Sequence, residues 1–156
     1  MSQRVRHRRA DVVARVVGEF ERLDEVVARL RPEDWERRVP RSETRDPWTV
    51  KDAIAHIVYW KAHAARVARR EPPPADERGL EYTEQNRVVY ERWRDRPAAD
   101  VLAWHRQVHE EVLAALAAAP DEWFGGRERS AEWPSDLDGH SAAHRVRDLE
   151  AALGEA

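Results

Sequence analysis

The chain has 156 residues, a formal net charge of -3 and no cysteine, and this length suits one domain with one buried core. The missing cysteine excludes disulfide bonds, thiolate metal ligands and cysteine nucleophiles. Charged residues make up 37% of the sequence and the mean hydropathy is -0.83, but apolar residues recur in periodic blocks, which is typical of a globular protein with polar outer faces.

The first two predicted elements are long helices. Apolar residues recur at spacings of three and four over 8–30, which predicts one amphipathic helix there. Thr49, followed three residues later by Asp52, resembles a capping box, and the apolar run that comes next predicts a second helix over 50–70. This helix must end there because three consecutive prolines follow at 72–74.

Three more helices are expected in the second half of the chain. A short helix is predicted over 82–93, a third long helix over 98–119 and a last one over 139–153, with Asp138 as its cap. There is no convincing strand pattern and no internal repeat. The sequence therefore predicts an all-α fold, a four-helix bundle with an extra short helix before the third long helix, in a single domain over 1–156. Eight apolar residues are expected to form the centre of its core: Val16, Phe20, Leu23, Ile54, Ile57, Val108, Val112 and Leu149.

The histidines are the only residues whose spacing suggests chemistry. Two pairs have a spacing of four, His105 with His109 and His140 with His144. Residues four apart share one face of a helix, so both rings of a pair can bind one metal ion, with a third ligand from another helix. The alternative for His105 and His109 is structural, because both border the apolar stripe of the third long helix. His56 points into or along the core and needs a partner, of which a metal is one.

Residues 48–57, Trp-Thr-Val-Lys-Asp-Ala-Ile-Ala-His-Ile, resemble the second-helix signature of the DinB-like superfamily. That superfamily includes the mycothiol-dependent maleylpyruvate isomerase N-terminal domain and the ClbS/DfsB family. The middle of the chain resembles ClbS/DfsB more than the others, through 86–90, 94–97, Val101-Leu102, His109 and 113–124. The resemblance covers nearly the whole chain after about Phe20 and implies the same bundle fold.

DinB-like proteins commonly hold a divalent metal with a histidine on the second helix and a His-x-x-x-His pair on the last. The matching residues here are His56, His140 and His144, so the resemblance implies a site for Zn²⁺ or Ni²⁺. In the isomerase branch the first member of the last pair is Glu, so His140 follows the DinB form. One position departs from the pattern: the usual aliphatic residue four after the second histidine is Asp148, and Leu149 comes one later. On a regular helix, with about 100° per residue, this turns the histidine pair toward solvent unless the helix is distorted or covered on both sides.

The resemblance leaves three functions open. One is a small metalloenzyme that hydrolyses a reactive small molecule, or transfers or isomerises it with a low-molecular-weight thiol, with Trp60 and His63 as pocket residues; its catalytic residues are unknown. The second is a ClbS/DfsB-like resistance protein that sequesters or inactivates a toxic natural product without metal. The third is a non-catalytic bundle, dimeric and with incidental histidines. A homodimer is compatible with all three.

Location and partners follow from charge and hydropathy. No apolar stretch approaches the length of a membrane span, and the arginines of the N-terminus precede no apolar run of the kind that a signal peptide has. These features, with the absence of cysteine, predict a cytoplasmic protein without a membrane partner. Acidic residues are spread throughout the chain, so no nucleic-acid partner is expected either.

Overall fold

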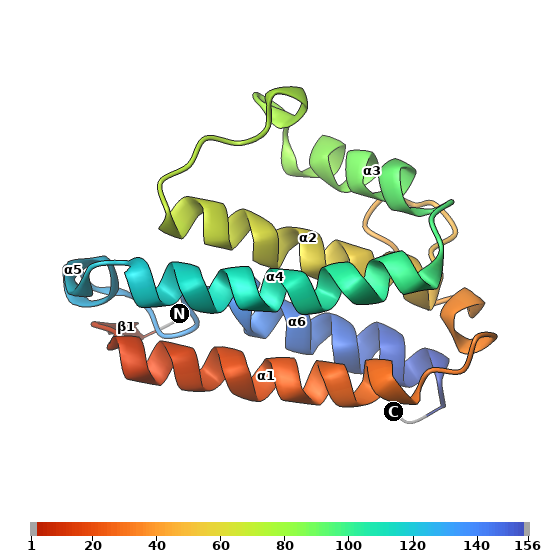
Figure 1. The fold of residues 1–156 in the computed structure, drawn as a ribbon, viewed down its shortest axis with the longest axis horizontal. Coiled ribbons are helices and arrows are strands. Elements are labelled where there is room, and N and C mark those ends of the chain that lie inside the picture. The colour runs from red at the N-terminus through yellow and green to blue at the C-terminus, as the bar shows by residue number, and fades with distance from the viewer. Residues whose placement is uncertain (1–2, 155–156) are drawn as a thin grey trace.

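Four long helices lie side by side in the computed structural model, which describes residues 3–154 (Figure 1). A short helix, α3, lies over α2 on the outside of this bundle. The predicted all-α fold, with an extra short helix before the third long one, is therefore confirmed. The main helices are α1 (Arg9–Arg29), α2 (Val50–Ala68), α3 (Tyr82–Trp93), α4 (Ala98–Ala118) and α6 (Gly139–His144), which continues as the π-helical segment η4 (Arg145–Glu150).

Helix α2 is the central element, in contact with α3, α4 and α6. Every residue from Val50 to Ala62 is buried, whichever side of the helix it lies on. The predicted capping box is present: the Thr49 side chain accepts a hydrogen bond from the Asp52 N–H, and the Asp52 carboxylate accepts one from the Thr49 N–H at 2.9 Å. A helix that is covered on all sides can position a polar side chain inside the protein, away from bulk water.

The last helix changes its winding directly after His144. Hydrogen bonds in η4 have π-helical spacing, one residue wider than in an α-helix. As a result, His144 and Leu149 are both buried, with exposed fractions of 3% and 0%. The helix is also covered by α1 and α2, so the histidine pair does not turn to solvent as it would on a regular, one-sided helix. Asp138 stands at the N-cap position, but its side chain makes no capping hydrogen bond and pairs with Arg15 instead, which corrects that prediction.

Several short elements have no counterpart in the prediction. Helix α5 (Asp121–Gly125) follows α4, and a two-residue strand β1 (Arg4–Val5) pairs antiparallel with β2 (Arg129–Ser130). Such segments are too short to show a hydrophobic period. The described part of the chain also contains three single turns of 3-10 helix: η1 (Asp34–Glu36), η2 (Ala75–Glu77) and η3 (Ser135–Leu137).

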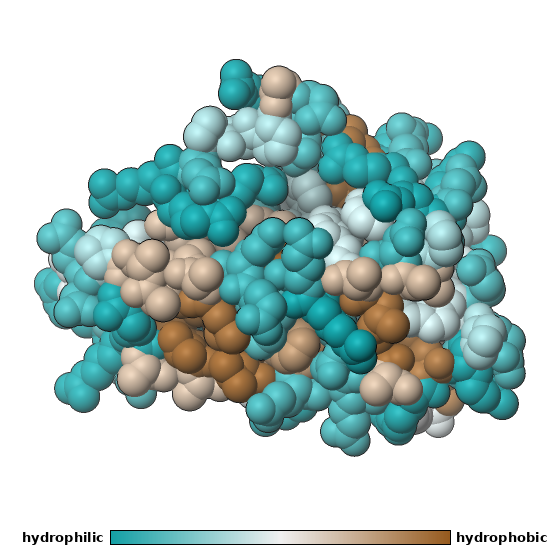
Figure 2. Space-filling model, viewed as in Figure 1, coloured by the Kyte–Doolittle hydropathy of each residue, from teal (hydrophilic) through white to brown (hydrophobic). Residues whose placement is uncertain are grey.

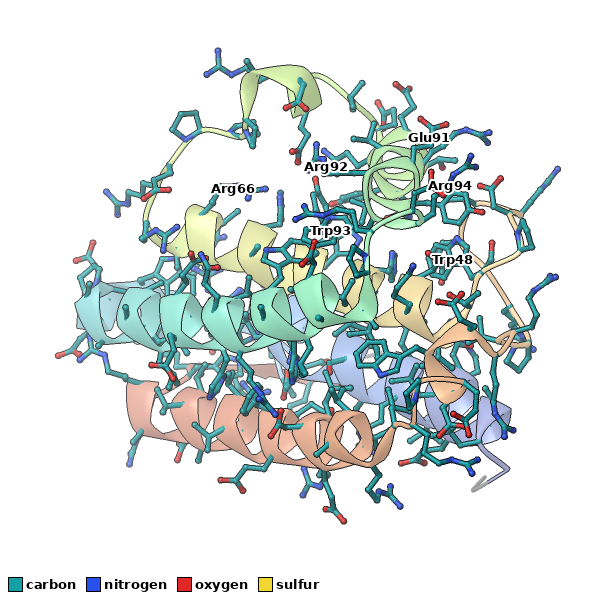
Figure 3. All side chains as sticks on the ribbon, turned by 45° about the vertical axis from the view of Figure 1, so that its right-hand side comes forward. Trp48, Arg66, Glu91, Arg92, Trp93 and Arg94 are labelled. Atoms are coloured by element: carbon teal, nitrogen blue, oxygen red, sulfur yellow. The ribbon has the colours of Figure 1, made fainter. Side chains whose placement is uncertain are left out.

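A buried carboxylate fixes α3 and the loop that precedes it. Glu77 is 2% exposed, accepts a hydrogen bond from the Tyr59 hydroxyl, and lies 3.6 Å from Arg66 and 3.5 Å from Arg92. Figure 3 shows Arg66 on α2 and Arg92 on α3 projecting toward the same region between the two helices. These contacts hold α3 in place, and Trp93 of α3 stacks on Trp104 of α4 at 4.2 Å.

The core lies between α1, α2, α4 and the last helix. The expected core residues are buried except Phe20, which is half-buried. Figure 2 shows a largely hydrophilic face over α1 and α4, with hydrophobic side chains visible between the two helices. None of the described helices has the combination of length and apolarity that a membrane crossing requires.

Candidate metal centre

The rings of His56, His140 and His144 meet where α2 lies against α6. Their ring centroids are 4.6 to 5.0 Å apart, and Nε2 of His56 is 3.2 Å from Nε2 of His140. One nitrogen from each ring lies within 4.8 Å of the other two. Three atoms this close together all lie within roughly 4 Å of a common point, which is the limit expected for a site whose ligand bonds are near 2 Å. The structure therefore brings together the three histidines that the sequence singles out.

Two neighbouring elements position these rings. His56 comes from the buried half of α2 and is 2% exposed, whereas His140 and His144 are one turn apart on α6. His140 is only partly buried and borders a cavity. Among the described residues, no other group of three or more His, Cys, Asp or Glu side chains is close enough to hold one ion.

Asp148 fixes the orientation of His144. Its Oδ2 lies 2.6 Å from Nδ1 of His144, so a protonated Nδ1 donates to the carboxylate and Nε2 keeps a free lone pair. Burial by itself raises the pKa of Asp148, but hydrogen bonds from His144 and Arg147 outweigh it and hold that pKa below its usual value. Asp148 is therefore an anion at neutral pH. The Nδ1 atoms of His56 and His140 are buried with no hydrogen-bond partner among the described residues, so His144 alone is oriented in this way.

The electrostatic environment keeps two of the rings neutral. Burial, assisted by the neighbouring His144 and His140, lowers the pKa of His56 to about 2. Burial also lowers the pKa of His140 to about 4, with His144, Arg147 and Lys61 acting in the same direction. A neutral imidazole offers the lone pair that a metal ion needs, so no proton has to be removed from these rings at neutral pH.

A cavity of about 270 Å³ opens beside the cluster, and it is called the histidine cavity below. The indole N–H of Trp60 donates to Asn86 Oδ1 at 2.9 Å, which fixes one wall of this cavity. Trp60 is thus a pocket residue, as predicted; His63 packs edge to face on the Trp60 ring at 5.1 Å and lines a neighbouring cavity. The histidine cavity is lined by Glu43, His56, Trp60, Tyr82, Asn86, Asp136 and His140.

Glu43 is a site residue that the sequence did not indicate. It lies in the irregular loop before α2, where no periodic pattern distinguishes one acidic residue from another. Its Oε1 is 3.5 Å from Nε2 of His144 and 3.4 Å from a guanidinium nitrogen of Arg147. The side chain is 40% exposed, so its carboxylate lies at the opening of the cluster.

The alternative histidine pair belongs to a different part of the bundle. His105 Nε2 lies 3.1 Å from Asp24 Oδ1, and both His105 and His109 stack on Phe20, at 4.9 and 3.5 Å between ring centroids. Neither ring joins the cluster of three. These contacts agree with the structural alternative: His105 pairs with a carboxylate, and both rings pack on an apolar side chain.

A protein family and two solved structures are similar to this chain. The sequence model of the family described as "Mycothiol maleylpyruvate isomerase N-terminal domain" matches residues 16–151. No curated protein matches the chain. A crystal structure of an uncharacterised protein from Escherichia coli UTI89 is similar, with a TM-score of 0.71, 15% identity, and 97% of this chain and 98% of that chain covered.

The colibactin self-resistance protein ClbS, crystallised in complex with a double-stranded DNA, is also similar. Its TM-score is 0.65 at 12% identity, with 95% of this chain and 92% of that chain covered. At such identities the likeness shows the fold alone. The DinB-like resemblance is confirmed by the family match and by the ClbS fold. The DNA in the ClbS crystal conflicts in part with the expectation that this chain has no nucleic-acid partner.

Proposed function

Because the chain belongs to the mycothiol maleylpyruvate isomerase N-terminal domain family, we propose that it binds a divalent metal ion through His56, His140 and His144 and acts there on a reactive small molecule. One observation carries the proposal: three ring nitrogens from two helices lie within 4.8 Å of one another beside a cavity. Imidazole nitrogens suit Zn²⁺ and Ni²⁺. The donor set therefore fits the ions that the resemblance implies.

The bound ion would lower the pKa of a water molecule or polarise a substrate oxygen. The chain's own residues then have distinct roles. Asp148 holds the proton on Nδ1 of His144 and keeps Nε2 directed at the cluster. Glu43 places a carboxylate beside that Nε2, in position to accept a proton from a group that enters the histidine cavity. Trp60 supplies a buried aromatic wall of the histidine cavity, and Tyr82 lies at its rim.

The reaction that we propose is hydrolysis of the small molecule, or its transfer or isomerisation with a thiol. The chain has no cysteine, so a thiol must come from a separate low-molecular-weight compound. The name of the family points to mycothiol. Addition of the thiol to the purified protein, with and without metal, separates the two reactions, because hydrolysis needs no thiol.

The test is the metal content of protein purified without a histidine tag. We expect about one equivalent of Zn²⁺ or Ni²⁺ in the wild type and loss of stoichiometric binding in His144→Ala, measured by titration calorimetry and mass spectrometry. His109→Ala is the matched control and should bind metal like the wild type, because its ring stacks on Phe20 outside the cluster. Circular dichroism should show that both variants stay folded. Unchanged metal binding in His144→Ala would contradict the proposal.

A second function is favoured by the aromatic walls of the histidine cavity. Trp60 and Tyr82 pack edge to face at 5.3 Å, and they offer a surface for a planar compound. The alternative is thus a ClbS-like protein that sequesters or inactivates a toxic natural product without metal. A wild-type protein that binds no metal but binds such a compound would favour it. A homodimer in the cytoplasm stays a prediction for either function.

A further inference from the structure

A second cavity, of about 250 Å³, lies on the other side of Trp60 and His63 from the histidine cluster; it is called the tryptophan cavity below. Its apolar walls come from α2, from α5 and from the segment before α6, and their main residues are Ala64, Val67, Trp123, Trp133 and Leu137. The rings of Trp123 and Trp133 are 4.7 Å apart and inclined by 57°. The Arg129 guanidinium covers Trp133 at 4.1 Å, which holds this ring in place.

The two cavities share a wall. Asp136 lines both of them, and the Trp60 ring of the histidine cavity packs edge to face on the His63 ring of the tryptophan cavity. Cavities that bind small molecules usually measure about 300 to 1,000 Å³. Each cavity alone is below that range, whereas the two together are within it. A molecule that fills both would pass over Asp136.

The exposed apolar side chains point to the same place. Among the described residues the large hydrophobic side chains that are exposed are Tyr82, Val67 and Val146, with exposed fractions of 71%, 53% and 47%. Tyr82 borders the histidine cavity and Val67 borders the tryptophan cavity, whereas Val146 borders neither. Single exposed hydrophobic residues are common on proteins, but these two give each of the adjoining cavities an apolar rim.

Asp136 places a carboxyl group where the two cavities meet. Its side chain is half-buried, and its carboxyl makes no hydrogen bond or ion pair within the described part of the chain. Burial raises the pKa of this carboxyl, because the cavity walls exclude part of the water around it. A partly buried carboxyl without a partner is stabilised by an N–H or O–H group that approaches through the cavity.

We propose that the tryptophan cavity is a substrate subsite and that the substrate is an elongated molecule with three parts: a flat apolar end between Trp123, Trp133 and Val67, a hydrogen-bond donor against Asp136, and a reactive end at the histidine cluster. The proposal rests on the proposed function, since it assumes that chemistry takes place at His56, His140 and His144. It narrows the substrate class to aromatic amines, amides or alcohols with a reactive group at the opposite end.

The first test uses metal-free protein and two probes, naphthylmethylamine and naphthylmethanol. In nitrogen-15 spectra, each of the seven tryptophans gives one indole signal, and both probes should shift the signals of Trp123 and Trp133, assigned with Trp→Phe variants.

Val67→Asp places a charge on the apolar wall and should weaken binding about tenfold. Val146→Asp is the matched control, with similar exposure but no cavity, and should leave the affinity unchanged. Asp136→Asn should weaken binding of the amine more than that of the alcohol.

The second test uses Zn²⁺-loaded protein and two hydroxamates, acetohydroxamate and a phenylbutyl hydroxamate. The phenyl group should improve the affinity of the wild type and of Val146→Asp but not of Val67→Asp. If the wild type takes up no metal, the proposed function fails, while the metal-free titration still tests the subsite. If metal binds but Val67→Asp binds every probe like the wild type, or the two indole signals do not move, the subsite is overturned and the proposed function is unaffected.

Discussion

His144 has the best-defined orientation in the cluster, because Asp148 accepts a hydrogen bond from its Nδ1 while the corresponding atoms of His56 and His140 have no such partner in the described chain. A second pair of the same kind exists elsewhere in the bundle. Asp24 of α1 lies 3.1 Å from His105 of α4, and neither residue belongs to the cluster. The two pairs allow the effect of orienting a metal ligand to be separated from the effect of removing a carboxylate that pairs with a histidine.

Asp148→Asn should weaken Zn²⁺ binding by about 10 to 100-fold, which is the usual effect of losing a hydrogen-bond partner of a metal ligand. Asparagine can present either its oxygen or its nitrogen to Nδ1, so the tautomer of His144 is no longer fixed. Asp24→Asn should leave the affinity for Zn²⁺ unchanged. Calorimetric titration of metal-free protein measures both variants, and equal affinities for Asp148→Asn and the wild type would show that Asp148 has no role in ligand orientation.

At the scale of the elements, the long helices follow from periodicity and capping. The observed α1, α2 and α4 begin and end within two residues of their predicted bounds. The start of α2 is the clearest case, because Thr49 and Asp52 satisfy each other's backbone N–H groups. Helix α2 also carries His56, so its first turn sets the depth of that histidine in the bundle.

Thr49→Ala should lower the free energy of unfolding by about 1 kcal/mol, since one half of the capping box is lost. Urea unfolding of the metal-free protein, followed by circular dichroism, measures this change. Thr83→Ala serves as the control, because Thr83 is exposed in the first turn of α3, where the cap position belongs to Glu81. Equal destabilisation by the two substitutions would contradict a specific role for the cap.

Other parts of the fold and the site could not be predicted, for physical reasons. Helix α5 and the β1–β2 pair are too short for a period to show. The late position of Leu149 indicated that the last helix is either distorted or covered on both sides, but it did not specify the π-helical winding of η4, which packs between α1 and α2. Glu43 lies in a loop, where its position depends on the chain's path rather than on its neighbours in sequence. The three histidines could be found because the resemblance joined His56 to a pair that spacing alone left ambiguous.

At the scale of the whole molecule, buried polar groups link the helices across the core. Glu19 of α1 is 3% exposed, accepts a hydrogen bond from the Ser141 hydroxyl, and lies 2.7 Å from the Arg145 guanidinium. Histidines that stay neutral add to this interior. Burial lowers the pKa of His105 to about 4; Lys61 acts in the same direction, and the neighbouring Asp24 opposes it.

The stability of the metal-free protein should fall as the pH is lowered from about 6.5 to about 4. Above pH 6.5 His105 is neutral in the folded and the unfolded chain, whereas below it only the unfolded chain takes up the proton, which favours unfolding. A shift of this size corresponds to about 3 kcal/mol once the pH reaches 4. Protonation of carboxylates also destabilises the folded protein in acid, so the test is a comparison. His105→Gln should lose less stability than the wild type between pH 7 and 4.5 in urea titrations. An identical loss would contradict the prediction.

The π-helical turn of η4 has a consequence for how this chain is compared with its relatives. A π-helical turn holds one residue more than an α-helical turn, so it is equivalent to a single-residue insertion in the last helix. With that insertion, Leu149 returns to the core position that DinB-like helices fill with the aliphatic residue four after the second histidine, and the extra place is free for Asp148, the partner of His144. An alignment with relatives whose last helix is regular therefore needs a one-residue gap between His144 and Leu149.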